Sequence, residues 1–493
     1  MNRLLVTMTG VLLLSTGCPT QEPEKKECQL EAFDLSACDR SSLSTVTGDG
    51  IWHVNVTLEG SETSGAMRLT AEDAQLFGAP LTERRTEGDT FFLASDFQDP
   101  GYAATRFALA ACQATAPNQV KGEFRRCSGG AADLKGTFEA VRVSRYANEA
   151  EASGLTLVHE ALLPNKAVGM NVFVANKYAY VTALGSGLFV YHVGDPAVGA
   201  PVKKAEVIPI RGDSWHQAWV MGSTLYVASS LEGLIIFDVS NPEVPKRVRT
   251  LPIPAVEVWG LHVAGNRLYA MSPAPRAEVL IYDLQIPQAP SLLSRYVVED
   301  SAPEQGDSPV GGAFLDGKLY IGHWRYGLAV TDVSKAKPEK AGSFRYDKAS
   351  SRYVAVGVIG GKTIAFEASE GWGSRVRALE VTEPEDETKP LNIRELASYV
   401  LRPESSVLGV TLVGTKLYVA HSLDGLRVLD VSNLGGTGPY QLPQASWYNT
   451  WRETDPGRGR FFLDGLSSVM VPGDGYIYAT DTSRGLLIFR EQG

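Results

Sequence analysis

One phrase recurs seven times between residues 178 and 490 of this chain. In its clearest copy the pair Leu225-Tyr226 is followed by a short loop, by Gly233-Leu234 and by an alternating apolar run that ends at Asp238. Successive copies lie 46, 43, 51, 44, 54 and 60 residues apart. Repeats of this length, built from several short alternating segments, are typical of β-propeller blades and not of helical solenoids. The tyrosine position is occupied by Tyr180, Tyr226, Tyr269, Tyr320, Ile364, Tyr418 and Tyr478.

Two-residue turns separate the first and second strands that we expect in most copies. Pairs such as Gly222-Ser223, Gly265-Asn266 and Asp316-Gly317 lie between apolar segments. These residue types accept the positive φ that tight hairpins require. Each blade is therefore predicted to begin with a β-hairpin.

The ends of the repeat region predict how the ring closes. The last copy stops at a third strand, residues 485–490, and the chain ends three residues later. An apolar segment at 155–161 precedes the first copy and has no hairpin partner of its own. If it supplies the missing fourth strand, no sheet edge is left open where the ring closes. The sequence thus predicts an all-β, seven-bladed propeller over residues 155–490.

Residues 233–245 resemble the repeat of the LVIVD family, predicted β-propeller repeats of bacterial secreted and surface proteins. Residues 327–334 and 425–433 are close copies of the same motif. Other copies depart from it, because His192, Glu380 and Arg490 stand where the motif has an aspartate. The resemblance implies a propeller in an extracytoplasmic setting and implies no reaction.

The N-terminus agrees with that setting. Arg3 precedes an apolar run at 4–14, and Ser15-Thr16-Gly17-Cys18 follows, which is the pattern of a secretory signal. The residues before Cys18 resemble a bacterial lipobox, although Ser15 stands where leucine is usual. We expect a signal peptide at 1–17, a lipidated Cys18 and a linker at 18–27; the alternative is an ordinary secretory signal. The expected location is the bacterial cell envelope, with the outer membrane favoured over the inner, and the lipid is the only expected membrane attachment.

A second, smaller domain is expected at residues 28–150. Short alternating segments separated by turn residues predict a small antiparallel β-domain, either a barrel or a sandwich. The order of its strands does not follow from the sequence. The alternating segments are 50–58, 66–69, 91–95, 105–109, 121–125 and 136–143.

Four of the five cysteines, Cys28, Cys38, Cys112 and Cys127, lie in this smaller domain. An even number outside the cytoplasm predicts two disulfides, for which three connectivities are possible. We favour Cys28–Cys38 and Cys112–Cys127, because the second pair brackets an expected turn at 117–118. A metal site is the alternative, but close Cys-x-x-Cys spacing is missing.

Candidate functional residues come from aligning the copies three positions after the tyrosine. In a propeller, the loops between second and third strands lie on the same face as the connections between blades. Four consecutive copies place polar residues there: His323, Glu367, His421 and Asp481. Together with His216 they could hold a divalent cation. The alternative, which we favour, is that they cap the loop backbone, so no cofactor is expected.

Tryptophans on or beside the same face could bind a partner. Partly exposed aromatic side chains rimmed by polar loops suit a protein or a carbohydrate, although many tryptophans in propellers only fill space between blades. The isoelectric point near 5.4 and the lack of a basic stripe argue against nucleic acid. The tryptophans in or next to the connections of this face are Trp215, Trp219, Trp259, Trp324 and Trp372.

Two functions of different classes follow. In the first, which we favour, a lipid-anchored and monomeric propeller acts as a binding or scaffold protein. In the second it is a hydrolase or lyase, possibly metal-assisted, that uses Glu367 with His323 or His421. The first is favoured because the inner strands carry small or apolar residues near the axis, whereas propeller enzymes place polar groups there. Those inner positions are Val172, Ala218, Leu261, Ala313 and Leu412.

Overall fold

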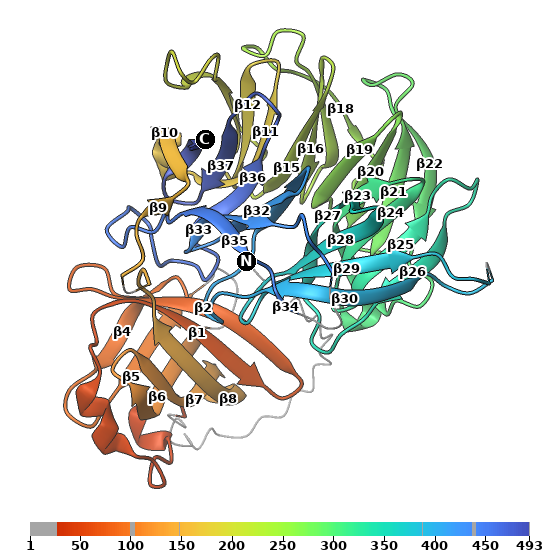
Figure 1. The fold of residues 1–493 in the computed structure, drawn as a ribbon. Coiled ribbons are helices and arrows are strands. Elements are labelled where there is room, and N and C mark those ends of the chain that lie inside the picture. Colours follow the sequence, from red (N-terminus) through yellow and green to blue (C-terminus); the bar gives the residue numbers. More distant parts are fainter. Residues whose placement is uncertain (1–26, 99–103, 147, 387, 436–439, 493) are drawn as a thin grey trace, which may run out of the picture.

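The computed structural model describes residues 27–98, 104–146, 148–386, 388–435 and 440–492. The predicted signal peptide and Cys18 lie outside these residues. The described residues contain four 3₁₀ helices: η1 (Leu30–Ala32), η2 (Arg40–Thr45), η3 (Pro164–Lys166) and η4 (Pro303–Gln305). The other regular elements of these residues are strands, which form a barrel and a propeller (Figure 1). Within the described ranges, no helix has the length and apolar character needed to cross a bilayer.

The smaller domain is a closed antiparallel barrel of eight strands, so the barrel alternative holds. Each strand pairs with the next, and β8 pairs with β1 to close the sheet. Apolar residues on alternate positions, among them Trp52, Leu93 and Leu109, fill its interior. The strands are β1 (Gly50–Leu58), β2 (Ser61–Leu69), β3 (Gln75–Leu76), β4 (Ala79–Arg85), β5 (Phe92–Phe97), β6 (Thr105–Ala116), β7 (Gln119–Ser128) and β8 (Ala131–Arg142).

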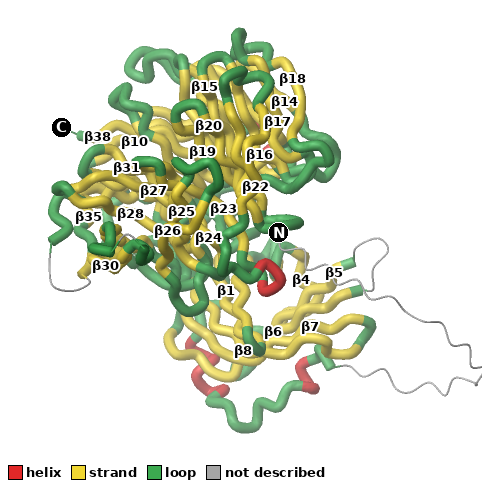
Figure 2. The backbone as a smooth tube through the Cα atoms, turned by 90° about the vertical axis from the view of Figure 1, so that its right-hand side faces the viewer, coloured by secondary structure: helices red, strands yellow, loops and turns green. Residues whose placement is uncertain are grey.

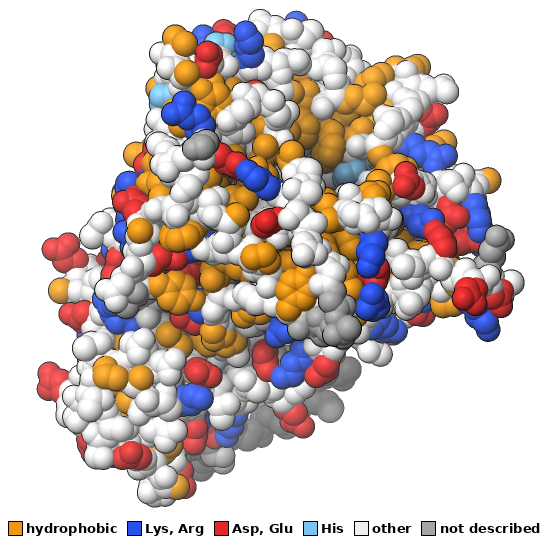
Figure 3. Space-filling view, in the orientation of Figure 1, with side chains coloured by type: hydrophobic (Ala, Val, Ile, Leu, Met, Phe, Trp, Pro, Cys, Tyr) orange, Lys and Arg blue, Asp and Glu red, His pale blue; other side chains and the backbone are white. Residues whose placement is uncertain are grey.

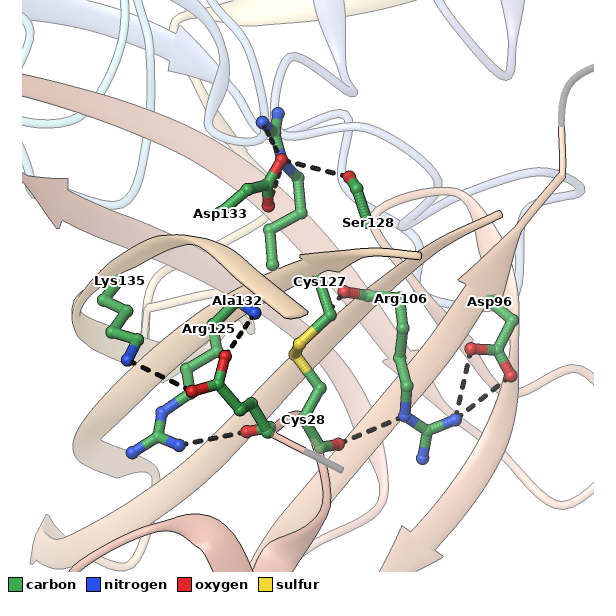
Figure 4. Close-up of a disulfide and its surroundings, with 11 residues drawn as sticks. Cys28, Asp96, Arg106, Arg125, Cys127, Ser128, Ala132, Asp133 and Lys135 are labelled. Carbon is green, nitrogen blue, oxygen red and sulfur yellow. Dashed lines mark hydrogen bonds and ion pairs between the residues drawn. A yellow bond between two sulfur atoms is a disulfide. The ribbon is translucent and has the colours of Figure 1, made fainter. Parts of the chain in front are cut away.

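The barrel holds two disulfides, as predicted, but their expected pairing was wrong. Cys28 bonds Cys127 and Cys38 bonds Cys112. The expected turn at 117–118 does join β6 to β7. Across that hairpin, however, Cys127 faces Arg106, and Cys112 lies beside Gly122. The two cysteines are therefore not opposite each other. Figure 4 shows Arg106 donating to the carbonyl oxygen of Cys28, which helps hold the N-terminal segment on the barrel.

The predicted seven-bladed propeller is confirmed. The first four blades are four-stranded antiparallel sheets in which the chain runs from an inner to an outer strand. They comprise β11 (Val168–Ala175), β12 (Tyr178–Leu184), β13 (Gly187–His192) and β14 (Val202–Val207); β15 (Trp215–Met221), β16 (Thr224–Ser229), β17 (Gly233–Asp238) and β18 (Lys246–Leu251); β19 (Gly260–Ala264), β20 (Arg267–Ser272), β21 (Glu278–Asp283) and β22 (Ser291–Tyr296); and β23 (Ser308–Leu315), β24 (Lys318–Trp324), β25 (Gly327–Asp332) and β26 (Glu339–Phe344).

Blades 5 and 6 each gain a fifth strand, and blade 7 is closed by a strand from the start of the propeller, β10, which pairs with β38. Blade 5 comprises β27 (Ser351–Ile359), β28 (Lys362–Ser369), β29 (Val376–Thr382), β30 (Asn392–Tyr399) and β34 (Tyr440–Gln441). Blade 6 comprises β31 (Gly409–Val413), β32 (Lys416–His421), β33 (Gly425–Asp430), β35 (Gln444–Tyr448) and β9 (Ala152–Ser153). Blade 7 comprises β36 (Leu466–Met470), β37 (Ile477–Asp481), β38 (Gly485–Glu491) and β10 (Leu155–Ala161).

The repeated phrase forms the apolar contacts between blades. In blade 2 the tyrosine Tyr226 and its strand partner Ile236 pack with Leu261 and Leu268 of blade 3. Gly233 has a φ of +78°, and a Cβ there would lie 2.5 Å from the carbonyl oxygen of Leu251. Glycine is therefore required where the third strand begins beside the outer strand.

Candidate functional site

The loop face of the propeller is the face that carries the loops between second and third strands and the connections between blades. The seven aligned residues lie at or near the ends of the second strands beside this face, but all of them are buried. They do not form an exposed binding surface. In blade order they are Ala183, Ser229, Ser272, His323, Glu367, His421 and Asp481.

Three members of this column are held by neighbouring groups. Glu367 accepts hydrogen bonds from Arg377 and from the hydroxyl of Tyr346, both at 2.8 Å. Asp481 accepts from Arg458 at 3.0 Å and from the backbone N–H groups of its own loop. The hydroxyl of Ser229 accepts from the loop N–H of Glu232. Asp481 and Ser229 thus cap the backbone of their loops.

His323 and His421 have different surroundings. Burial lowers the pKa of His323 to about 4, and neither ring nitrogen has a hydrogen-bond partner among the described residues. No three histidine, cysteine or carboxylate side chains in the described part of the chain are grouped to hold a metal ion. The four column residues are therefore not gathered into one site.

His421 lies between a serine and an aspartate, but the geometry is not that of a catalytic relay. Its Nδ1 is 2.9 Å from the hydroxyl of Ser405 and 3.2 Å from the carboxylate of Asp424, while Nε2 has no partner. A hydrolase triad needs the acid on one ring nitrogen and the nucleophile on the other. Because both groups meet the same nitrogen and all three side chains are buried, the arrangement is structural.

The barrel covers the loop face of blades 5 and 6 and the connection to blade 7 (Figures 1 and 2). Ile51 and Val143 of the barrel side pack with Leu423 and Trp451 of the propeller in one buried cluster. Nδ1 of His53 lies 2.5 Å from the carbonyl oxygen of Glu404. Part of the expected binding face is thus occupied by the chain itself.

Buried charges fix this contact. Arg402 pairs with Asp424 at 2.7 Å and donates to the carbonyl oxygen of Ser144, just after the barrel. Burial alone would raise the pKa of Asp424, but Arg402, His421 and Arg427 outweigh burial and hold this pKa below its usual range. Arg427 also pairs with Glu149 of the linker at 2.7 Å. The linker and the barrel are therefore tied to blade 6.

His53 is neutral at this contact. Burial lowers its pKa to about 4, against the opposing effect of the bond to Glu404. Its ring centroid lies 4.8 Å from that of Phe462, on the connection to blade 7. A neutral imidazole can donate Nδ1–H to the carbonyl while Nε2 stays unprotonated.

A cluster of ring and charged side chains lies on the uncovered part of the loop face. The ring of His216 packs against that of Trp259 at a tilt of 30°, with centroids 5.1 Å apart, and the guanidinium of Arg352 lies 5.0 Å from the Trp259 ring centroid. Arg352 pairs with Glu370 at 2.7 Å. Burial and the charge of Arg352 lower the pKa of His216 to about 3. We call His216, Trp259, Arg352 and Glu370 the axial cluster.

Arg352 reaches this cluster because blade 4 is narrow at its inner strand. Arg352 belongs to blade 5 and Trp259 precedes blade 3. A Cβ on Gly311 of blade 4 would lie 2.2 Å from the carbonyl oxygen of Arg352. Glycine thus lets blades 4 and 5 approach closely. His216 and Trp259 were predicted from the sequence as candidates, whereas Arg352 and Glu370 were not. The Gly311-Gly312 pair in an inner strand was the signal for their approach.

The centre of the ring is more aromatic than the inner positions had indicated. Trp219 lies between Phe173 and His262, each ring centroid 5.1 Å away, on the inner strands of blades 1 to 3. In Figure 3 hydrophobic side chains gather around a hollow near the positions of β15 and β19. The small residues noted in the sequence, such as Val172 and Ala218, instead point into contacts between blades.

Exposed aliphatic side chains surround the loops of blade 2. Ile253 is 87% exposed and Ile208 is 77% exposed, and Ile210 and Leu231 are also exposed. Leu231 lies beside the connection from blade 1, since its N–H donates to Asp213. We call Ile208, Ile210, Leu231 and Ile253 the blade 2 patch.

The other predicted tryptophans have separate environments. Trp215 is buried, and its indole N–H donates to Asp213 at 2.8 Å, so it fills space within the blade. Trp372 is half-buried and lies 6.1 Å from Phe462, between ring centroids, beside the barrel contact. Trp324 is half-buried at the end of β24. Only Trp259, among these four, belongs to the axial cluster.

Comparisons with known proteins agree with the repeat pattern. Residues 212–249 and 406–435 match the LVIVD repeat, so the chain carries LVIVD repeats in blades 2 and 6. No curated protein matches the sequence.

Three of the solved structures that are similar to the chain illustrate the likeness. The computationally designed Ika8 protein has 8% identity and a TM-score of 0.45, covering 68% of this chain and 99% of its own. A chain of the mitotic checkpoint complex has 10% identity and a TM-score of 0.47, covering 72% and 97%. The β-propeller domain of Cps50 (Swd1) from Myceliophteria thermophila has 12% identity and a TM-score of 0.46, covering 66% and 97%.

Proposed function

We propose that the chain is a binding protein whose propeller presents the uncovered loops of blade 2 to a protein partner. The observation that carries this proposal is the blade 2 patch, four aliphatic side chains that project from neighbouring loops. Exposed apolar side chains that gather on one part of a surface are typical of protein interaction sites. The barrel blocks blades 5 and 6, so the patch lies on the part of the loop face that a partner can reach.

The proposed setting is the bacterial cell envelope, with lipid on Cys18 as the anchor and the outer membrane favoured. Two disulfides and the LVIVD repeats support an extracytoplasmic protein. The anchor rests on the sequence before Cys18 alone. Cys28 is bonded to the barrel, so about ten residues would separate the lipid from the folded chain.

A glycan is the second candidate partner. Trp259 and Trp324 are half-buried on the same face, and the exposed face of an aromatic ring can pack against a sugar ring. The faces of Trp259 are engaged by His216 and Arg352, however, and the blade 2 patch is aliphatic. These contacts favour a protein over a glycan.

Site-specific photocrosslinking in cells tests the proposal. A photoreactive amino acid replacing Ile253 should give a discrete protein adduct, and one replacing Val358, also exposed but on the opposite face, should not. Leu231→Asp should reduce the Ile253 adduct about tenfold, because a charge in an apolar contact costs more than 1.4 kcal/mol. Equal adducts at both positions, or none at Ile253, would contradict the proposal.

Elemental analysis separates this function from the metal-assisted alternative. The purified chain should contain no stoichiometric divalent metal. One equivalent of metal, lost when His323 and Glu367 are replaced, would instead favour the hydrolase or lyase.

A further inference from the structure

Every blade has a one-residue bulge at the same place in its outer strand. In each case the pairing between the third and outer strands skips one residue of the outer strand. A bulge twists an edge strand and disturbs its ladder, which protects the edge before the bulge from further pairing. The skipped residues, in blade order from 1 to 7, are Lys204, Val248, Leu293, Ala341, Leu396, Ala445 and Val158.

Two blades show what the edge after the bulge can bind. In blade 5, β34 pairs in parallel with Ala397 and Ser398, directly after Leu396. In blade 6, β9 pairs antiparallel with Trp447 and Tyr448, soon after Ala445. Both added strands come from connecting segments and not from a blade. This part of the outer edge therefore accepts a short extended segment in either direction.

Blade 5 also shows how the bulge residue is covered. Leu396 is only 4% exposed and belongs to the same buried cluster as Leu442, which follows β34, with Tyr440 packed against it. The N–H of Leu442 donates to the carbonyl oxygen of Ser398 at 2.7 Å. The added segment thus supplies both backbone hydrogen bonds and apolar cover.

Blade 3 has the same bulge residue without the cover. Leu293 is 52% exposed, and Leu292 and Val297 beside it are exposed too. In Figure 1, β22 lies at the outer edge of the ring. The first four residues of β22, Ser-Leu-Leu-Ser, carry no charge.

Neighbouring blades protect the same edge. Blade 1 has Lys203 and Lys204 there, and blade 2 has Lys246, Arg247 and Arg249. Charged residues on an edge strand discourage pairing with another chain. In blade 4 the N–H of Lys340 is bound by Glu299. Blade 3 therefore differs from blades 1, 2 and 4 in leaving apolar side chains before and at the bulge uncovered, and the one charge of β22, Arg295, is paired with Glu278.

We propose that the outer edge of blade 3 binds an extended apolar segment of a partner protein. The main chain of that segment pairs with residues 294–296, and its aliphatic or aromatic side chains cover Leu293 and Val297. Backbone pairing gives affinity and the apolar cover gives selectivity, as in other cases of strand addition. This surface is separate from the blade 2 patch and does not depend on the function proposed above.

A second copy of the chain fits this edge less well than a peptide. Two β22 edges paired antiparallel about Arg295 would place the two Arg295 side chains opposite each other, and like charges so placed are destabilising. The two segments added in blades 5 and 6 are only two residues long in their paired part, which a connecting segment matches better than a complete strand.

A peptide from the chain itself provides the probe. A fluorescent peptide of residues 440–444, Tyr-Gln-Leu-Pro-Gln, is titrated with the full chain and followed by anisotropy. We expect saturable binding that Leu293→Lys weakens at least about tenfold, because a charge replaces the apolar contact. Val248→Lys, the same change at the blade 2 bulge, should alter binding less than about twofold. A peptide with aspartate for Leu442 should bind at least about tenfold more weakly.

Several outcomes would overturn this proposal. They are no binding of the peptide at millimolar concentration, equal binding by the Leu293→Lys chain, or an equal loss in the Val248→Lys chain. Sedimentation that shows a wild-type dimer dissociated by Leu293→Lys would assign the edge to a second copy instead. Unchanged thermal unfolding of both variants shows that the edge, and not the fold, was altered. Photocrosslinking at Ile253 is unaffected by these variants, so the two proposals fail separately.

Discussion

Arg402 and Asp424 form a buried ion pair beneath the barrel, with Nη2 and Oδ1 2.7 Å apart. Arg402 reaches the pair from the connection between blades 5 and 6, and Asp424 from a loop of blade 6. Because Arg402 also donates to Ser144, the pair joins two propeller segments to the chain that leaves the barrel. The position of the barrel therefore depends on a charge that has no contact with solvent.

Replacing Asp424 should be strongly destabilising. Asp424→Asn leaves the guanidinium groups of Arg402 and Arg427 buried without their shared carboxylate. Removal of one partner from a buried pair costs about 3–5 kcal/mol of unfolding free energy. The measurement is urea unfolding followed by tryptophan fluorescence.

The exposed pair Lys335–Glu339 provides the control, and Lys335→Ala should cost less than about 1 kcal/mol. The double variant Arg402→Leu/Asp424→Leu should be more stable than Asp424→Leu alone, since it removes one of the uncompensated charges. If Asp424→Asn costs no more than Lys335→Ala, the buried pair does not hold the barrel.

His53 should make the chain sensitive to mild acid. Its pKa is about 4 in the folded chain and 6.5 in an ordinary environment, so the unfolded chain binds the proton more readily between these values. The contribution of His53 is complete above pH 6.5 and is lost as the pH falls toward 4. A difference of about 2.5 pH units corresponds to about 3 kcal/mol.

A variant isolates this effect from other titrating groups. His53→Gln removes the titration and keeps an amide donor for Glu404. Between pH 7 and pH 4.5 the wild-type chain should lose about 2 kcal/mol more unfolding free energy than the variant does. The comparison also cancels the effect of Asp464, which is present in both chains. Burial raises the pKa of Asp464 to about 6, so its contribution to the unfolding free energy grows as the pH falls, opposite to that of His53. Parallel pH profiles of the two chains would show that His53 does not titrate at this contact.

The repeat predicted the propeller because its signals are local. Tyr226 and Gly233 lie within one blade, and their spacing reflects strand and turn lengths that recur in each copy. The end position of the aligned residues on their strands was also predicted. Their burial was not, because it depends on loops packing on one another and on contacts with the distant barrel, such as that of His53 with Glu404, 351 residues apart in sequence.

The axial cluster depends on packing that no spacing reveals. Arg352 is an isolated arginine in an inner strand, and only the close approach at Gly311 brings it to Trp259. The disulfide pairing also depends on strand register, which the sequence does not reveal. Cys112 and Cys127 lie on the two strands of one hairpin, but the register does not place them opposite each other.

The disulfide pairing can be checked directly. Peptide mapping without reduction should recover Cys28 joined to Cys127 and Cys38 joined to Cys112. Replacing Cys28 and Cys127 together by serine should cost about 2–5 kcal/mol in the unfolding of the barrel, because the bridge closes a long loop. A fragment that joins Cys28 to Cys38 would contradict the observed strand register.

Gly311 should be intolerant of a side chain although its φ is ordinary. A Cβ at this position would lie 2.2 Å from the carbonyl oxygen of Arg352, which is backbone and cannot rotate away. Gly311→Ala should therefore push blades 4 and 5 apart and cost about 1–3 kcal/mol of unfolding free energy, the usual cost of overpacking.

Gly199→Ala is the matched control, since nothing lies within 4 Å of its Cβ and its φ is not positive. That variant should change stability by less than about 1 kcal/mol. Urea unfolding of the two variants decides the matter: equal stability would show that blades 4 and 5 have room to separate, and that the position of Arg352 over Trp259 does not require glycine.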